Sequence, residues 1–138
     1  NEGLNAALIK AVQECREKGI RFRYVVMGRP DRIDSMDMGT LLYNLLSNGI
    51  EACMAVETER ELELVVREED GTTEIFMENT ISGSVLKNNP NLESRKQDKR
   101  YHGFGMESIR GIIGKYQGHY SYREESGRFI QEIDLRDG

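Results

Sequence analysis

The segment LLYNLLSNGIEAC, residues 41–53, constrains the possible fold more than any other part of the chain. Its hydrophobic residues recur at the period of an α-helix, and a broad face is filled by Met38, Leu42, Leu45, Leu46 and Cys53. The opposite sector is narrow and polar, with Asp37, Asn44, Asn48 and Glu51. We therefore expect a largely buried helix from near Asp37 to about Val56, with a single polar stripe.

The hydrophobic pattern predicts the other elements around this helix. Residues 2–18 read as a helix that Gly19 can end, and residues 20–26 alternate as a strand. An Asp-Gly turn joins two strands that span residues 62–79, and a Glu-Ser-Gly turn joins two more within residues 119–135. A third helix follows Gly105, and the loop of residues 80–102 has no period. This order predicts an α+β fold, a two-layer sandwich with a mixed, mostly antiparallel sheet covered on one face by helices.

Composition narrows the possible partners. The 138 residues suit a single domain, residues 1–138, and 24 acidic against 19 basic residues give a net charge of -5. A chain with this charge has no global positive field, so we expect no nucleic-acid partner and no direct membrane contact. The two cysteines lie far apart in sequence, which argues against a disulfide framework or a metal cluster and fits a reducing cytosol.

The two asparagines of the polar stripe are unusual choices for a helix. An ordinary solvated helix face would explain a polar stripe, but Glu, Lys, Arg or Gln would serve water better than Asn44 and Asn48. A carboxamide offers a neutral oxygen that can bind a hard cation such as Mg²⁺, which takes its other ligands from water and phosphates. Two asparagines one turn apart can therefore line a nucleotide phosphate site. Glu51 either holds a metal-bound water or points into solvent.

A second motif, HGFGMESI, places Gly103 and Gly105 immediately before a predicted helix. Unpaired backbone amides and the positive end of the helix dipole favour a phosphate group there, although a flexible turn before a helix would show the same two glycines. Four basic residues precede the motif and can clamp phosphate oxygens or simply lie in solvent: Arg95, Lys96, Lys99 and Arg100.

Taken in order, these motifs resemble the ATP-binding domain of the gyrase, heat-shock chaperone, histidine kinase and MutL (GHKL) superfamily, which has the Bergerat α/β sandwich. LLYNLLSNGIEAC is similar to its N box, FMENT to the start of its first glycine box and HGFGMESI to its second glycine box. Within the superfamily, SRKQDKRYHGFGMESI is most similar to the catalytic domains of sensor histidine kinases of the peptide-pheromone quorum-sensing receptor type.

The resemblance implies ATP and Mg²⁺ as ligands and assigns three residues to catalysis. Asn48 is implied to bind the Mg²⁺ that bridges the phosphates, and Asn44 to contact phosphate or its hydration shell. Lys96 is implied to neutralise phosphate from an ATP lid formed by residues 80–102.

The remaining candidate nucleotide contacts also come from the resemblance. Gly103 and Gly105 are implied to let the backbone approach the phosphates, and His102 beside them is a candidate phosphate contact. Asn79 falls where many relatives carry the aspartate that accepts the adenine amino hydrogen. The sequence reads NTISG where Asp-x-Gly-x-Gly is usual. The hydrogen bond from the adenine amino group would therefore be accepted by the uncharged carboxamide oxygen of Asn79.

Asn44 also bears on the reaction. In the ATP-hydrolysing members and the anti-sigma serine kinases, a glutamate one turn before the metal asparagine is the general base. Asn44 cannot take a proton, whereas the neutral imidazole of a histidine acceptor already has a nucleophilic lone pair. The resemblance therefore implies transfer of the ATP γ-phosphoryl group to a histidine.

That acceptor histidine is expected outside this chain. His102 and His119 do not lie in a helical acceptor pattern, so we expect a dimerisation and phosphoacceptor helical domain of the same receptor before Asn1, with a response regulator downstream. The domain would belong to the cytoplasmic part of a membrane-bound receptor. Two alternatives stay open: a degenerate GHKL nucleotide-binding module without kinase turnover, and an anti-sigma-type serine kinase.

Overall fold

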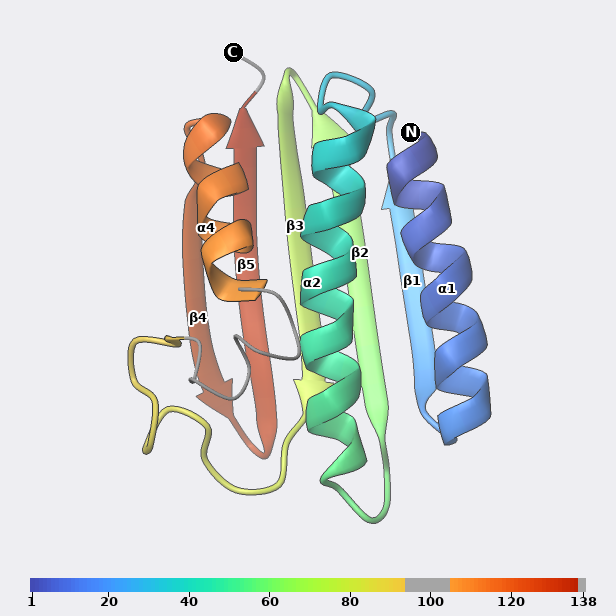
Figure 1. Ribbon diagram of the computed structural model, residues 1–138, viewed down its shortest axis with the longest axis vertical. Helices are drawn as coiled ribbons and strands as arrows, with labels where there is room; N and C mark the ends of the chain where they lie inside the picture. The colour runs from blue at the N-terminus through green and yellow to red at the C-terminus, as the bar shows by residue number, and fades with distance from the viewer. Residues whose placement is uncertain (94–104, 137–138) are drawn as a thin grey trace.

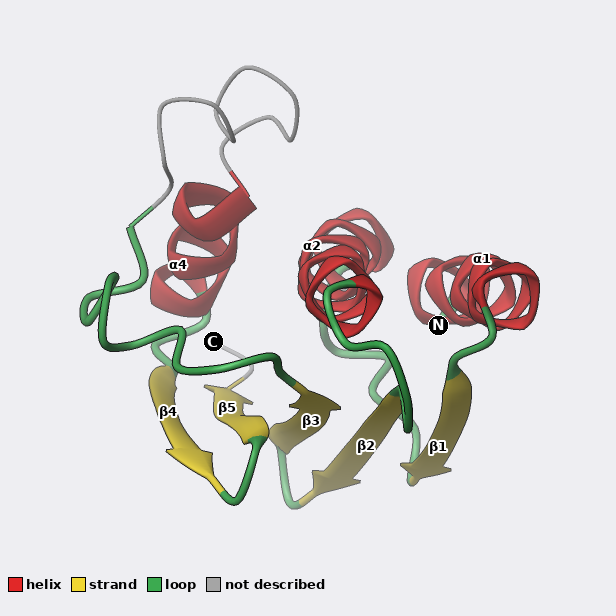
Figure 2. Cartoon of the chain, turned by 90° about the horizontal axis from the view of Figure 1, so that it is seen from below, coloured by secondary structure: helices red, strands yellow, loops and turns green. Residues whose placement is uncertain are grey.

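The chain folds into two layers, a sheet and a set of helices that covers one of its faces (Figure 1). The computed structural model describes residues 1–93 and 105–136. In these residues the sheet has five strands, and α1, α2 and α4 all lie on the same side of it, as the view from below shows (Figure 2). The predicted α+β two-layer sandwich is confirmed.

The first helix, α1 (Glu2–Lys18), begins and ends at residues suited to these positions. The side chain of Asn1 accepts a hydrogen bond from the Leu4 amide at 3.1 Å and so caps the first turn. Gly19 adopts a left-handed conformation with φ 67°, and its amide donates to the Cys15 carbonyl. The chain then enters β1 (Arg21–Met27), an edge strand of the sheet.

The central helix, α2, spans Ser35–Met54, so it starts and stops two residues earlier than the pattern predicted. The start is set by Asp34, whose carboxylate accepts hydrogen bonds from the amides of Met36 at 3.1 Å and Asp37 at 3.3 Å. An aspartate N-cap fixes where a helix begins without contributing to its hydrophobic period.

Two tight hairpins supply the remaining strands. The first joins β2 (Glu61–Glu69) to β3 (Thr72–Thr80), and the second joins β4 (His119–Glu125) to β5 (Arg128–Arg136). Both residues of each turn have positive φ, which is the type I′ geometry that matches strand twist: Asp70 at 53°, Gly71 at 81°, Ser126 at 51° and Gly127 at 76°.

The strands are arranged in the order β1-β2-β3-β5-β4. β1 pairs with β2 in parallel, with Tyr24 opposite Leu64, and every other pairing is antiparallel. This is the mixed, mostly antiparallel sheet that the sequence predicts. The third helix, α4 (Gly105–Lys115), returns to the sheet over β4 and β5 (Figure 1).

The hydrophobic core lies between the helices and the sheet. α2 is its centre, since Leu41, Leu42 and Leu45 are fully buried against the sheet, and α4 adds Ile109. Burying a leucine side chain contributes about 1.5–3 kcal/mol, so this helix dominates the packing energy. None of the helices in residues 1–93 and 105–136 combines the length and hydrophobicity needed to cross a bilayer.

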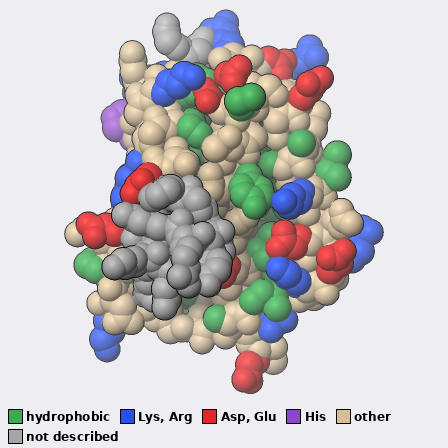
Figure 3. Space-filling model, viewed as in Figure 1, with side chains coloured by type: hydrophobic (Ala, Val, Ile, Leu, Met, Phe, Trp, Pro, Cys, Tyr) green, Lys and Arg blue, Asp and Glu red, His purple; other side chains and the backbone are tan. Residues whose placement is uncertain are grey.

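The outer surfaces are charged on both sides of the sandwich. On the helical face, side chains of both signs are interspersed with hydrophobic ones (Figure 3). No helix of the described residues covers the other face of the sheet (Figure 2), where charged side chains of neighbouring strands form ion pairs. These pairs include Arg21–Glu61, Arg23–Glu63, Arg67–Glu74 and Arg123–Glu132.

Candidate functional site

The candidate site lies where the polar stripe of α2 faces the beginning of α4. Asn44 and Asn48 are both half-buried, one helical turn apart. A Cβ atom built on Gly105, the first residue of α4, would lie 3.3 Å from Oδ1 of Asn44 and 4.0 Å from Oδ1 of Asn48. The two carboxamide oxygens therefore converge on one point, which is the first residue of the second helix.

The amide groups of both asparagines contact other residues. Nδ2 of Asn44 donates to the Thr40 carbonyl of its own helix at 2.8 Å, and Nδ2 of Asn48 contacts the Met106 sulfur at 3.9 Å. Each contact fixes which way round the carboxamide lies, because only the nitrogen can donate. The oxygens are the atoms directed toward Gly105.

This donor set suits a hard divalent cation shared with a phosphate ligand. Carboxamide oxygens are ligands that Mg²⁺ accepts in small number while it keeps water and phosphate oxygens in its other positions. In the described residues there is no group of three or more His, Cys, Asp and Glu side chains placed to hold a metal ion. Among the residues predicted as metal or phosphate contacts, Asn44, Asn48 and Gly105 are brought together.

Gly49 lets α2 approach the sheet beside these asparagines. A Cβ atom on Gly49 would lie 2.9 Å from Cδ1 of Leu62 on β2 and 3.6 Å from Oδ1 of Asn79 on β3. The predicted adenine contact, Asn79, is therefore directly beneath the helix that carries Asn48. It is 2 % exposed, and its Nδ2 donates to the Thr80 carbonyl at 3.1 Å.

Asp37 does not join the asparagines, although it shares their sector of the helix. Its carboxylate accepts hydrogen bonds from Lys115 Nζ at 2.7 Å and from Tyr116 Oη at 2.6 Å, both at the C-terminal end of α4. These two donors lower the pKa of the Asp37 carboxyl below its ordinary value. Asp37 thus ties α2 to α4 at the opposite end from Gly105, a role that no sequence pattern indicated.

The first part of the predicted lid is also held by a residue that the sequence did not single out. Thr80 still belongs to β3, and the segment that follows it is fixed to Glu124 of β4. The Glu124 carboxylate accepts hydrogen bonds from Ser84 Oγ at 2.7 Å and from the amides of Val85 and Leu86. Burial raises the pKa of this carboxyl, but the three hydrogen bonds outweigh that effect and leave it lowered.

Three predicted contacts, Lys96, His102 and Gly103, lie outside the described residues. Glu51, whose role the sequence left open, is on the exposed side of α2 and has an interaction partner of its own. Both roles that the sequence left open for Glu51, holding a metal-bound water or pointing into solvent, stay open.

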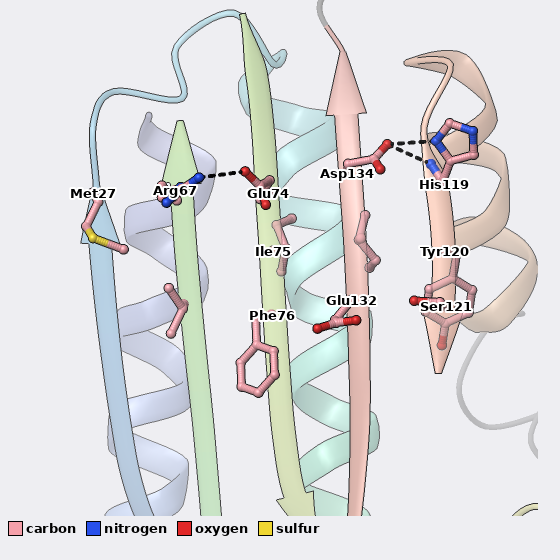
Figure 4. Close-up of a pocket in the computed structure, with 12 residues that line it drawn as sticks. Met27, Arg67, Glu74, Ile75, Phe76, His119, Tyr120, Ser121, Glu132 and Asp134 are labelled. Carbon is pink, nitrogen blue, oxygen red and sulfur yellow. Dashed lines mark hydrogen bonds and ion pairs between the residues drawn. The ribbon is translucent and has the colours of Figure 1, made fainter. Parts of the chain in front are cut away.

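A hollow of about 550 Å³ on the bare face of the sheet is a less suitable site (Figure 4). Its polar walls contact one another, since Arg67 pairs with Glu74 at 3.2 Å and Nδ1 of His119 lies 3.1 Å from an Asp134 carboxylate oxygen. The figure shows these pairs lying across the strands, on the side of the sheet away from the helices.

Comparison with solved structures places the fold among the catalytic domains of histidine kinases. The catalytic domain of histidine kinase ThkA matches with a TM-score of 0.75 at 16% identity, covering 99% of this chain and 91% of that one. The histidine kinase domain of the Erythrobacter litoralis blue-light activated kinase EL346 has a TM-score of 0.74 at 14% identity, covering 99% of this chain and 61% of that one. The mycobacterial sensor histidine kinase MprB has a TM-score of 0.67 at 16% identity, covering 96% of this chain and 93% of that one.

The sequence itself identifies the family. The family model described as the GHKL domain matches residues 33–136, well over half of the chain. The chain therefore belongs to the GHKL domain family and has the Bergerat fold. The comparison with curated proteins gave no match.

Proposed function

We propose that this chain is the catalytic domain of a bacterial sensor histidine kinase, which binds ATP with Mg²⁺ and transfers the γ-phosphoryl group to a histidine. The acceptor would be on a dimerisation and phosphoacceptor helical domain of the same receptor, with a response regulator downstream. The similarity of SRKQDKRYHGFGMESI to quorum-sensing receptors supports a peptide-pheromone receptor, and such a domain works in the cytoplasm.

One observation carries the proposal: the oxygens of Asn44 and Asn48 converge on the first residue of α4. The start of a helix presents unpaired amides and the positive end of its dipole, which stabilise a phosphate group. A phosphate placed there would have two neutral oxygen ligands for its metal ion on the facing helix. Membership of the GHKL family and the fold of histidine kinase catalytic domains support the same assignment.

The chemistry assigned to the protein is positioning rather than covalent catalysis. Asn48 would hold the cation, Asn44 would contact phosphate or its water shell, and Gly105 leaves space for both. When bound with ATP, Mg²⁺ supplies positive charge that offsets the charge of the phosphates. Lys96, His102 and Gly103, which lie outside the described residues, would complete the phosphate contacts. Asn79 on β3 would contact the adenine.

Asn44 supports a histidine acceptor over water or serine. A carboxamide cannot act as general base, and a neutral imidazole needs none. An anti-sigma-type serine kinase is therefore the weaker alternative. A nucleotide-binding module without turnover is the other alternative, supported by the departure of NTISG from the usual first glycine box.

Calorimetric titration with ATP, with and without Mg²⁺, tests the proposal. We expect Mg²⁺ to increase the affinity of the wild type, and Asn48→Ala to lose that increase while its circular dichroism spectrum is unchanged. Asn5→Ala is the matched control, because Asn5 is an exposed asparagine on α1. Equal metal dependence in Asn48→Ala and the wild type would refute the assignment.

The acceptor is tested separately by supplying the proposed dimerisation and phosphoacceptor helical domain together with labelled ATP. Acid-labile phosphate on a histidine is the expected product. Acid-stable phosphoserine would favour the serine kinase, and binding without transfer would favour the module without turnover.

A further inference from the structure

The C-terminal end of α4 is fastened to the N-terminal end of α2 by a connected set of hydrogen bonds. Tyr116 Oη accepts a hydrogen bond from the Asp34 amide at 3.1 Å and donates one to Asp37 at 2.6 Å. Lys115 Nζ donates to the same Asp37 oxygen at 2.7 Å. We name these four residues, Asp34, Asp37, Lys115 and Tyr116, the α2–α4 clamp.

The clamp and the candidate site share one side of α2. Asn44 follows Asp37 by seven residues and Asn48 follows it by eleven. At about 3.6 residues per turn these spacings are close to two and three whole turns, so all three side chains face α4. The two helices run in opposite directions (Figure 1), and α4 has only 11 residues between the site and the clamp.

Hydrophobic packing has no preferred direction, so it restricts the position of α4 along its axis less sharply than hydrogen bonds do. Its buried residues, Ile109, Ile112 and Ile113, contact the core through interactions that have no preferred direction. The hydrogen bonds of the clamp are short and directional, and the Asp37 carboxylate strengthens them. Tyr116 is itself 8 % exposed, so its hydroxyl is held in place by the packing of its ring.

We propose that Tyr116 and Asp37 are positioning residues, which set the placement of α4 so that Gly105 meets Asn44 and Asn48 at the phosphate site. This inference rests on the proposed function. A helix of this length moves as one body, so a shift at the clamped end appears at Gly105. Because Gly105 lies so close to both carboxamides, a small displacement changes the space left for phosphate and cation.

Tyr116→Phe is the direct test, because it removes the hydroxyl and keeps the ring. The affinity for ATP with Mg²⁺ should fall about five- to tenfold, the lower end of the typical range of coupling between two sites. The affinity without Mg²⁺ should fall less, because the cation contact of Asn48 is then absent and adenine recognition is assigned to Asn79 on β3. Lys115→Met removes one clamp donor at a side chain that is 62% exposed, so it keeps the fold and should cause a smaller loss in the same direction.

Cys15→Ala controls for general destabilisation, because Cys15 is a buried residue of α1, and α1 lies on the other side of α2 from α4 (Figure 1). Both affinities should be unchanged in this variant. Equal loss of both affinities in Tyr116→Phe, or loss in neither, would overturn the role of the clamp while leaving the proposed function intact. A wild-type protein without metal-dependent binding would overturn both.

Discussion

Oδ1 of Asn44 lies 3.3 Å from the point that a Cβ atom on Gly105 would occupy. A side chain of any size at residue 105 would therefore press against the carboxamide assigned to phosphate. Gly105→Ala should lower the affinity for ATP with Mg²⁺ about tenfold, since small misplacements in such sites are costly. The free energy of unfolding should change by less than about 1 kcal/mol, because alanine favours the helix. Titration calorimetry and urea unfolding measure the two quantities.

Gly111→Ala on the same helix is the control for this substitution. Apart from its chain neighbours and the backbone of its own helix, no atom of the described residues lies within 4 Å of the Cβ position at Gly111. It should stabilise the fold by about 0.5–1 kcal/mol and leave nucleotide affinity unchanged. Similar affinities for the two alanine variants would contradict the proposed role of Gly105.

Asn79→Asp would restore the residue that many GHKL relatives carry, yet we expect it to destabilise this protein. Asn79 is buried, and its amide donates to the Thr80 carbonyl, a bond that a carboxylate cannot make. The loss should be about 1–3 kcal/mol at pH 7, with the carboxyl pKa raised by burial. The carboxyl pKa is then higher in the folded than in the unfolded state, so the loss of stability relative to the wild type should become smaller as the pH falls. A variant as stable as the wild type at pH 7 would show that the Thr80 bond is dispensable.

Asp37→Asn tests the charge within the clamp. The folded pKa of Asp37 is lowered from 3.8, so its carboxylate stabilises the fold above that pH and the contribution disappears as the pH falls through the folded pKa. The variant should therefore be less stable than the wild type at pH 7, by less than about 1 kcal/mol because the group is partly solvated. The two proteins should converge in stability as the pH falls below 3.8 and through the lowered folded pKa of Asp37, in chemical unfolding followed at each pH. A difference that does not depend on pH would refute this account.

Glu124→Gln should release the segment that follows β3. The neutral amide accepts weaker hydrogen bonds from Ser84 and the Val85 and Leu86 amides than the carboxylate does. Exchange of these two amide hydrogens should accelerate severalfold in hydrogen exchange experiments, with little change in the β-sheet. Glu125→Gln, at the neighbouring exposed residue, should leave their exchange unchanged.

The order and type of the elements could be predicted because each depends on local patterns. Periodicity located α2, and the Asp-Gly and Glu-Ser-Gly sequences located both hairpins. The bounds of α2 were wrong by two residues because Asp34 sets the start through a side chain that carries no period. Pairing between β3 and β5 joins strands that are distant in sequence, which no local pattern specifies.

For the candidate site, the sequence could predict which residues share a face of α2 but not which residues of other elements contact them. Helical spacing gives the angle of a side chain around an axis, and it therefore grouped Asp37 with Asn44 and Asn48. It does not say which residues of another element lie opposite, so the partners of Asp37, Lys115 and Tyr116, were missed. Glu124 was missed likewise, because its partners are 38 to 40 residues away.

The parallel edge strand has a consequence for how the domain assembles. Arg21 on β1 meets Glu61 on β2 across 40 residues of sequence, whereas each hairpin closes through a two-residue turn. Bringing β1 and β2 together closes the longer segment, which costs more chain entropy before stabilising contacts form. We expect each hairpin to close before β1 pairs with β2. In the native protein, the same edge should open most readily, so the amide hydrogens of β1 would exchange before those of β3.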